Sequence, residues 1–174
     1  NSAILRNCNF LNNVSTSERG GGALFLNSTG NHLIDNCEFR GNRNEGITGN
    51  GGGAIHNWDE NIIIRNSKFI NNTSVNDGGA IYAWFRYAFE ISNCIFENNH
   101  SNQSGGAIHN RSNLKLTNST FTSNSSSRDG GAIFNSEEIR IANSIFKENS
   151  SSRLGGGICN TVLIGLLYAT NTLF

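Results

Sequence analysis

Several features that mark other classes of protein are missing from this chain of 174 residues. It contains no methionine and no signal peptide, so we expect it to be a segment of a longer protein. Thirteen basic and thirteen acidic residues cancel, which argues against a basic surface for nucleic acid and against an acidic tail. The apolar run 162–169 is too short to cross a bilayer, which takes ~20 residues.

The sequence also lacks the common motifs of cofactor and metal sites. It has no Cys-x-x-Cys or Cys/His zinc spacing, no calcium nonapeptide, no nucleophile elbow and no phosphate-binding loop. We therefore expect no cofactor, and His56 and His109 are too far apart in the expected fold to share a metal ion. Helix is disfavoured because the apolar residues show no period of 3.6 and glycine pairs interrupt every repeat.

What the chain does have is a repeated phrase, Asn-(Cys/Ser/Thr)-x-Phe-x-x-Asn, with successive copies 25 to 30 residues apart. Its phenylalanines are Phe10, Phe39, Phe69, Phe96, Phe121 and Phe146, and Phe174 ends a partial copy. A second phrase, Gly-Gly-Ala-(Ile/Leu) or its variant Gly-Gly-Gly-Ile, follows each complete copy and begins at Gly21, Gly52, Gly78, Gly105, Gly130 and Gly155. A period of this length is typical of a solenoid.

Each repeat divides into three short strands: an alternating apolar pair such as Ile62 and Ile64, the Phe segment, and Gly-Gly-Ala-Ile. This predicts an all-β fold, a right-handed single-stranded parallel β-helix of about 25–30 residues per turn and roughly six to seven turns, forming one domain over residues 1–174. Equivalent residues then lie ~4.8 Å apart, so the Phe side chains form an internal stack. The Asn residues around each Phe, such as Asn66 and Asn72, are expected to form structural ladders at the corners.

The first three repeats are longer, and their extra residues fall in 13–20 and 42–51. We expect loops to project there, because insertions in a solenoid gather at loops that often form its binding face. Both segments are rich in Gly, Asn, Ser and Thr, which fits mobility as well as it fits function.

The two phrases resemble the repeats of the chlamydial polymorphic outer-membrane proteins, and the pattern from Asn118 to Asn124 followed by Gly130 to Asn135 is closer still to adhesin-like repeat proteins of methanogenic archaea. The resemblance covers essentially the whole chain. It implies a right-handed parallel β-helix in an extracellular or cell-surface setting, acting as a stalk or adhesin passenger. It carries over no functional residue, because the shared motifs are those of the scaffold.

The cysteines are expected to be structural. Cys8, Cys37 and Cys94 occupy one repeat position, which elsewhere holds Ser or Thr, and this exchange indicates a small inward side chain. Cys8 and Cys37 would lie on adjacent turns, but parallel side chains hold their β-carbons slightly beyond the usual disulfide range. We favour buried thiols.

Two groups of residues are candidates for binding. The segment Tyr82, Trp84, Phe85, Arg86 and Tyr87 replaces a polar linker, and aromatic rings beside an arginine suit a sugar ring or a protein. The alternative is that these rings fold back over the rod.

The second group consists of the residue directly after the Ile or Leu of the glycine phrase, one from each turn. If that Ile points inward, these residues point outward and form a row along the stacked turns, which could bind an extended polymer or a second rod. The alternative is simple stacking beneath a covering loop. Its proposed binding members are Phe25, His56, His109 and Phe134, with Tyr82 between the histidines.

Catalysis is the weakest hypothesis. Asp77 and Asp129 precede Gly-Gly at the same repeat position, two turns apart; the ~9.6 Å between turns is near the upper limit for an inverting carboxylate pair. Asp-Gly is also ordinary turn chemistry. We therefore expect a non-catalytic adhesin or stalk segment that binds a glycan or protein on a cell surface. The alternatives are an extracellular filament or sheath subunit that binds copies of itself, and a carbohydrate-active enzyme.

Overall fold

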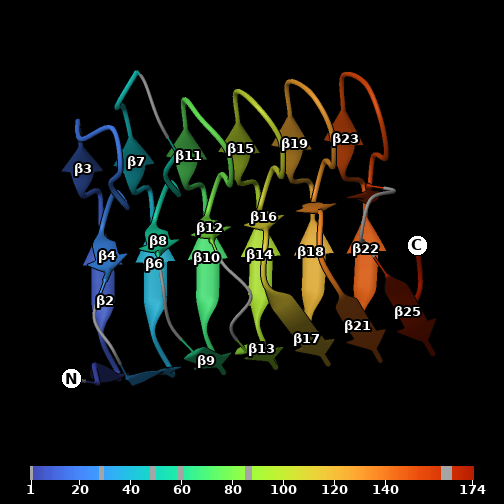
Figure 1. Cartoon of the computed structure of the whole chain (residues 1–174), viewed down its shortest axis with the longest axis horizontal. Coiled ribbons are helices and arrows are strands. Elements are labelled where there is room, and N and C mark those ends of the chain that lie inside the picture. The colour runs from blue at the N-terminus through green and yellow to red at the C-terminus, as the bar shows by residue number, and fades with distance from the viewer. Residues whose placement is uncertain (1, 28–29, 48–49, 59–60, 85–87, 162–165) are drawn as a thin grey trace.

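The computed structural model describes residues 2–27, 30–47, 50–58, 61–84, 88–161 and 166–174. These residues wind into a right-handed parallel β-helix, with successive turns stacked along the long axis from the N-terminus to the C-terminus (Figure 1). The fold class predicted from the repeat is confirmed. The described residues contain strands but no helix, and hence no helix that could cross a membrane.

Sheet A holds the alternating apolar pairs. Its strands are β1 (Ile4–Arg6), β5 (Asn31–Asp35), β9 (Asn61–Arg65), β13 (Ala88–Ser92), β17 (Asn113–Thr117), β21 (Ile139–Ala142) and β25 (Leu167–Thr170). In β9, Ile62 and Ile64 are fully buried while Ile63 between them is exposed. The period-two alternation therefore places the predicted residues in the core.

Sheet B holds the phenylalanines. Its strands are β2 (Asn9–Leu11), β6 (Glu38–Arg40), β10 (Lys68–Ile70), β14 (Ile95–Glu97), β18 (Thr120–Thr122) and β22 (Ile145–Lys147). Neighbouring Phe rings are stacked in parallel, with centroids 4.5 Å apart at the closest pair, Phe96 and Phe121, and 5.2 Å apart at Phe146 and Phe174. The spacing of the turns imposes this stack, which confirms the predicted core.

Sheet D begins at the Ile or Leu of the glycine phrase. Its strands are β4 (Leu24–Leu26), β8 (Ile55–Asn57), β12 (Ile81–Ala83), β16 (Ile108–Asn110), β20 (Ile133–Asn135) and β24 (Ile158–Asn160). Ile55, Ile81, Ile108 and Ile133 are fully buried in the central core. The glycine before each Ala allows neighbouring turns to approach: a Cβ on Gly106 would lie 1.9 Å from the carbonyl oxygen of Gly131.

The prediction of three strands per turn is wrong, because each complete turn has a fourth. Sheet C consists of β3 (Val14–Ser15), β7 (Arg43–Asn44), β11 (Thr73–Ser74), β15 (His100–Ser101), β19 (Ser125–Ser126) and β23 (Ser150–Ser151). These two-residue strands carry almost no apolar side chain, so hydrophobic alternation gives no signal for them. Two of their inward serines form hydrogen bonds instead: the Ser74 hydroxyl donates to the Gly51 carbonyl at 2.8 Å, and the Ser101 hydroxyl donates to the Asn76 carbonyl at 2.7 Å.

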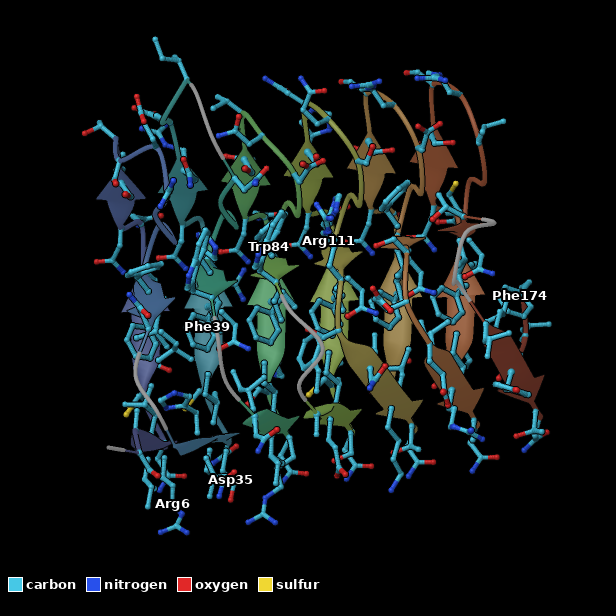
Figure 2. All side chains as sticks on the ribbon, viewed as in Figure 1. Arg6, Asp35, Phe39, Trp84, Arg111 and Phe174 are labelled. Carbon is cyan, nitrogen blue, oxygen red and sulfur yellow. The ribbon has the colours of Figure 1, made fainter. Side chains whose placement is uncertain are left out.

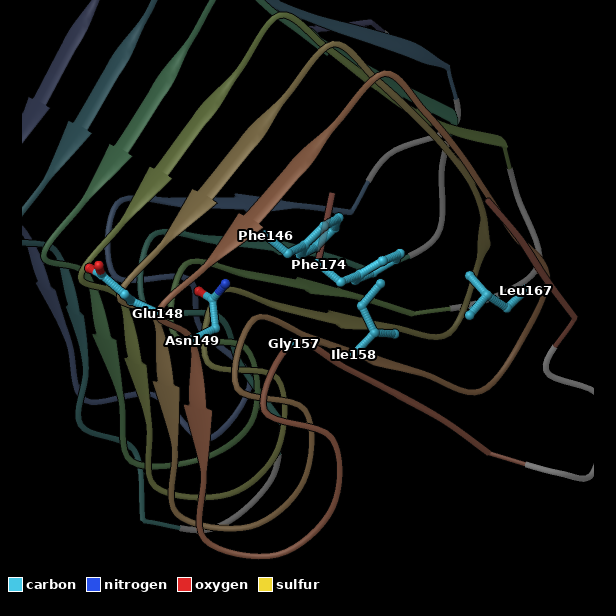
Figure 3. Close-up of a pocket in the computed structure, with 7 residues that line it drawn as sticks. All are labelled: Phe146, Glu148, Asn149, Gly157, Ile158, Leu167 and Phe174. Carbon is cyan, nitrogen blue, oxygen red and sulfur yellow. The ribbon is translucent and has the colours of Figure 1, made fainter. Parts of the chain in front are cut away.

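Between sheets C and D the chain makes an arm, which Figure 3 shows in cross-section as a loop that curves out and returns to the coil. The two segments predicted to project, 13–20 and 42–51, contain strands β3 and β7 of sheet C, and the described residues after each strand belong to such arms. Comparable arms follow sheet C in the later turns as well (Figure 1). The arm is thus a regular part of the repeat, not a feature of the longer turns alone.

The asparagine ladder after each Phe is confirmed. Asn42, Asn72, Asn99 and Asn124 are fully buried, and each backbone N–H and side-chain amide donates to the Oδ1 of the next asparagine at 2.9–3.0 Å. The asparagines before the Phe form a looser ladder at the surface: Asn66 is exposed, adopts φ 53°, and its Oδ1 accepts the Asn93 side-chain amide at 3.4 Å. Asn tolerates this left-handed conformation better than most residues, so its role is to shape the corner.

All four cysteines are free thiols, which confirms the prediction made for Cys8, Cys37 and Cys94. Cys37, Cys94 and Cys159 are buried, whereas Cys8, for which a buried thiol was expected, is partly exposed because it lies on the first turn. Cys37 and Cys94 each sit beside a serine of the next turn: the Ser67 hydroxyl accepts the Cys37 N–H, and the Ser119 hydroxyl accepts the Cys94 N–H, both at 3.1 Å. The Cys/Ser exchange thus marks one inward position.

Candidate functional site

The predicted row of aromatic and histidine residues exists in the expected register. Phe25 pairs with His56, His56 with Tyr82, Tyr82 with His109, and His109 with Phe134 along sheet D. Neighbouring rings have centroids 4.7–5.2 Å apart. None of these rings belongs to the central core cluster, so the row lies on the other side of the strand from Ile55 and Ile81.

The expectation of an exposed ribbon is nevertheless wrong for the middle of the row. The exposed fraction is 0% for His56 and Tyr82 and 7% for His109, and only Phe25, at 44%, is well exposed. The arms cover the row: the Asp77 carboxylate lies 3.1 Å from His109 Nδ1, and both ring nitrogens of His56 are buried without a hydrogen-bond partner among the described residues. The row is therefore a second buried cluster between sheet D and the arms, as the alternative of stacking beneath a loop predicted.

Burial dominates the electrostatics of this covered row. It lowers the pKa of His56 to about 4, and the positive charge of Arg19 acts in the same direction. Burial also raises the pKa of Tyr82, with a further contribution from the negative charge of Asp77. His56 is therefore neutral at physiological pH, and Tyr82 keeps its proton.

Burial opposes ionisation of Asp77, but His109 and the Ser104 N–H outweigh it and hold the pKa of the carboxyl below its usual value. The Asp77 carboxylate accepts the Ser104 N–H at 2.9 Å. Asp129 similarly accepts the Leu154 N–H at 3.2 Å. Each of the two aspartates proposed as a catalytic pair thus binds the backbone of the following turn.

Beside the covered row stands a column of four side chains that we call the Arg–Trp column. Trp58 and Trp84, which lie on adjacent turns and are partly buried, stack with centroids 5.8 Å apart and an interplanar angle of 8°. The Arg111 guanidinium lies 3.9 Å from the Trp84 ring centroid, and the Arg19 guanidinium lies 5.1 Å from that of Trp58. Figure 2 shows Trp84 and Arg111 next to each other on neighbouring turns.

Of the aromatic segment predicted to bind, the structure places Tyr82 in the covered row and Trp84 in the Arg–Trp column. Phe85, Arg86 and Tyr87 lie outside the described residues. Trp58, Arg19 and Arg111 were not among the residues predicted from the sequence to bind. Trp58, Trp84 and Arg111 share one repeat position, three residues after Ile55, Ile81 and Ile108, so an alignment of the turns could have found all but Arg19.

A cavity at the C-terminal end of the coil lies away from both groups of residues. It has a volume of about 410 Å³ and is lined by Phe146, Glu148, Asn149, Gly157, Ile158, Leu167 and Phe174 (Figure 3). Phe146 and Phe174 are the last two rings of the Phe stack, so this cavity continues the coil core. Within the described residues, no group of three or more His, Cys, Asp or Glu side chains could hold a metal ion.

Comparison with known proteins identifies the architecture. A protein-family model described as "right handed beta helix region" matches residues 1–163. No curated protein matches the chain. No solved structure matches it either.

Proposed function

The chain belongs to the right-handed β-helix family, and on this premise we propose that it is a non-catalytic segment of an extracellular or cell-surface protein. In this proposal the segment acts as an adhesin or stalk. The coil is the rigid support, and one of its sides presents the Arg–Trp column to a glycan or a protein on a cell surface.

The observation that carries the proposal is the restriction of the tryptophans to two turns. At the repeat position of Trp58 and Trp84, the two later turns after Arg111 have Ser136 and Thr161. The backbone contact is the same in each case: the N–H of Trp84 donates to the Asn57 carbonyl, and that of Thr161 donates to the Asn135 carbonyl, both at 2.9 Å. The fold therefore forms without tryptophan at this position, which favours a binding role for the two rings.

The scaffold suits such a role. The Phe stack and the asparagine ladder run from turn to turn, and stability in a solenoid accrues from each repeat and its neighbour contacts. Such a coil holds a lateral site without a large movement of its backbone. The similarity of the repeats to surface-exposed adhesin-like proteins supports the extracellular setting.

A non-catalytic role is supported by the contacts of the acidic residues at the glycine phrase. The carboxylates of Asp77 and Asp129 accept backbone N–H groups of the next turn. A general acid or base must instead reach the proton that it transfers. These contacts give the two aspartates a structural purpose.

The test is a binding assay with the whole chain on immobilised glycans and on cell surfaces. Replacing both Trp58 and Trp84 with Ser copies the side chain of Ser136 and leaves the repeat intact. Trp58 packs on His56 and Trp84 on Tyr82, so we expect the double variant to keep its native circular dichroism spectrum but to unfold at a lower temperature. Below that temperature it should bind at least about tenfold more weakly, as loss of a central aromatic contact costs about 2 kcal/mol or more.

The matched control is Tyr168→Ser. Tyr168 is an exposed aromatic residue on sheet A, and the Arg140 guanidinium lies 4.6 Å from its ring centroid. The control should bind like the unmodified chain. Equal binding by the double Trp variant would show that the column is not the binding site.

A further inference from the structure

The Arg–Trp column leaves no free aromatic face along its axis. Trp84 has Trp58 on the preceding turn and the Arg111 guanidinium on the following turn. Trp58 has Trp84 on the following turn and the Arg19 guanidinium from the first-turn arm. The order of the turns thus places one partner on each face of both indoles.

This arrangement argues against recognition by ring stacking. A neutral sugar that packs on a tryptophan, or a nucleic-acid base that stacks on it, needs an open indole face. What the column offers to a ligand is the exposed guanidinium groups of Arg19 and Arg111. A guanidinium held flat on an aromatic ring keeps those donors in a fixed fork that matches the oxygens of a carboxylate or sulfate.

The two arginines also keep their charge available. Arg19 and Arg111 are exposed, and neither forms an ion pair with a carboxylate in the part of the chain that the structure describes. The third arginine stacked on an aromatic ring differs, because Arg140 over Tyr168 also pairs with Glu138. Asp77, whose negative charge acts on Tyr82, has its carboxylate 3.1 Å from His109 Nδ1.

The spacing of the charges favours a polymer. Arg19 and Arg111 belong to the first and fourth turns, so about 14 Å separates them at about 4.8 Å per turn. A small anion cannot contact both guanidinium groups, whereas an extended chain with repeated anionic groups can. Nucleic acid is a poorer fit, because the chain has no net positive charge and the faces on which bases stack are covered.

We propose that the Arg–Trp column binds an acidic glycan, a polysaccharide that carries carboxylate or sulfate groups, laid along the axis of the coil. Arg19 and Arg111 contact anionic groups of the polymer, and Trp58 and Trp84 hold the two guanidinium groups in place. This inference rests on the proposed function and names the ligand class of the same side face.

The experiment measures binding of the whole chain to four immobilised probes: a polyuronate, a sulfated polysaccharide, neutral dextran and single-stranded poly-dT. We expect binding to the polyuronate, the sulfated polysaccharide or both, and none to dextran. Binding should weaken between about 0.1 M and about 1 M salt, because the screening length falls from about 10 Å to about 3 Å. Comparing the two anionic polysaccharides identifies which group is recognised.

The decisive variant replaces Arg19 and Arg111 with Gln together, and its matched control is Arg140→Gln. We expect the double variant to bind acidic glycan about tenfold more weakly or worse, since a hydrogen bond to a charged group contributes about 1.5–3 kcal/mol, and the control to bind normally. Both arginines of the double variant are exposed, so its thermal unfolding curve should not change. If it does unfold, the Arg19→Lys and Arg111→Lys pair retains the charge without the planar fork, and should bind less tightly than the unmodified chain.

Several outcomes would overturn the inference. Binding of neutral dextran that depends on Trp58 and Trp84 but not on the arginines would reject the acidic ligand and leave the proposed function standing. Tighter binding of poly-dT than of either anionic polysaccharide would assign the column to nucleic acid. Failure to bind any probe, with cell-surface binding that still depends on the tryptophans, would also reject the acidic glycan alone.

Discussion

The asparagine ladder offers the sharpest test of how the coil is held together, and Asn99→Ala is the variant to make. Asn99 is fully buried. Its Oδ1 accepts the backbone N–H of Asn72 at 3.0 Å and the side-chain amide of Asn72 at 2.9 Å. Its Nδ2 donates to the Phe69 carbonyl and to Asn124 Oδ1, both at 2.9 Å. Alanine removes all four hydrogen bonds.

The expected loss of stability depends on which hydrogen-bonding groups still have a partner in the Asn99→Ala variant and which one does not. The side-chain amide of Asn72 still donates to the Phe39 carbonyl, and Asn124 Oδ1 still accepts the Asn99 backbone N–H. The backbone N–H of Asn72 is left buried and unpaired, which costs about 1–3 kcal/mol, and the other lost hydrogen bonds contribute about 1 kcal/mol each. We expect the free energy of unfolding to fall by about 4–6 kcal/mol.

The assay is urea unfolding followed by far-ultraviolet circular dichroism, with hydrogen exchange to locate any local opening. The matched control is Asn113→Ala, which removes an exposed asparagine at the start of β17 and should change stability by less than about 0.5 kcal/mol. Loss of protection should be greatest at the turns of Asn72 and Asn99, because a solenoid opens through neighbouring repeats. A variant as stable as the control would refute the ladder as a source of stability.

Three further predictions test the core, the contacts between turns and the covered row. Phe121→Ala should lower the free energy of unfolding by about 3–5 kcal/mol, while Phe25→Ala at an exposed ring costs far less; equal losses in urea unfolding would contradict the stacked core. Gly106→Ala should abolish hydrogen-exchange protection where its turn meets the next, since its Cβ would lie 1.9 Å from a backbone oxygen, and an unchanged exchange pattern would disprove that close approach. The pKa of His56 is about 4 in the folded chain and 6.5 in the unfolded chain, because the folded chain buries the ring in its neutral form. The full stability is therefore present above about pH 6.5, and about 3 kcal/mol of it is lost as the pH falls through 4. His56→Phe should lack this component of the stability–pH curve, and identical curves would show that His56 is not buried as a neutral ring.

Much of the coil could be predicted from the sequence because its core repeats with the turn. Phe39, Phe69 and Phe96 recur at a near-constant spacing. Each packs on the equivalent Phe of the next turn, so the same residue type is needed at the same position of every turn. The same logic predicted the buried Asn72 position and the inward Cys/Ser position. In each case the partner is the equivalent residue of the next turn, so the period alone identifies the contact.

The sequence by itself determined the turn, its register and the inward side of the coil. Only the tertiary structure decided what covers the outside. Sheet C forms from short polar segments such as Thr73–Ser74, whose pairing depends on backbone hydrogen bonds that leave no pattern in residue type. Likewise, strand parity placed His56 and Tyr82 away from the core but could not show that the arms pass over them. The Arg–Trp column joins Arg19 from an arm to Trp58 at the end of strand β8, and such a contact between different parts of the repeat has no period to reveal it.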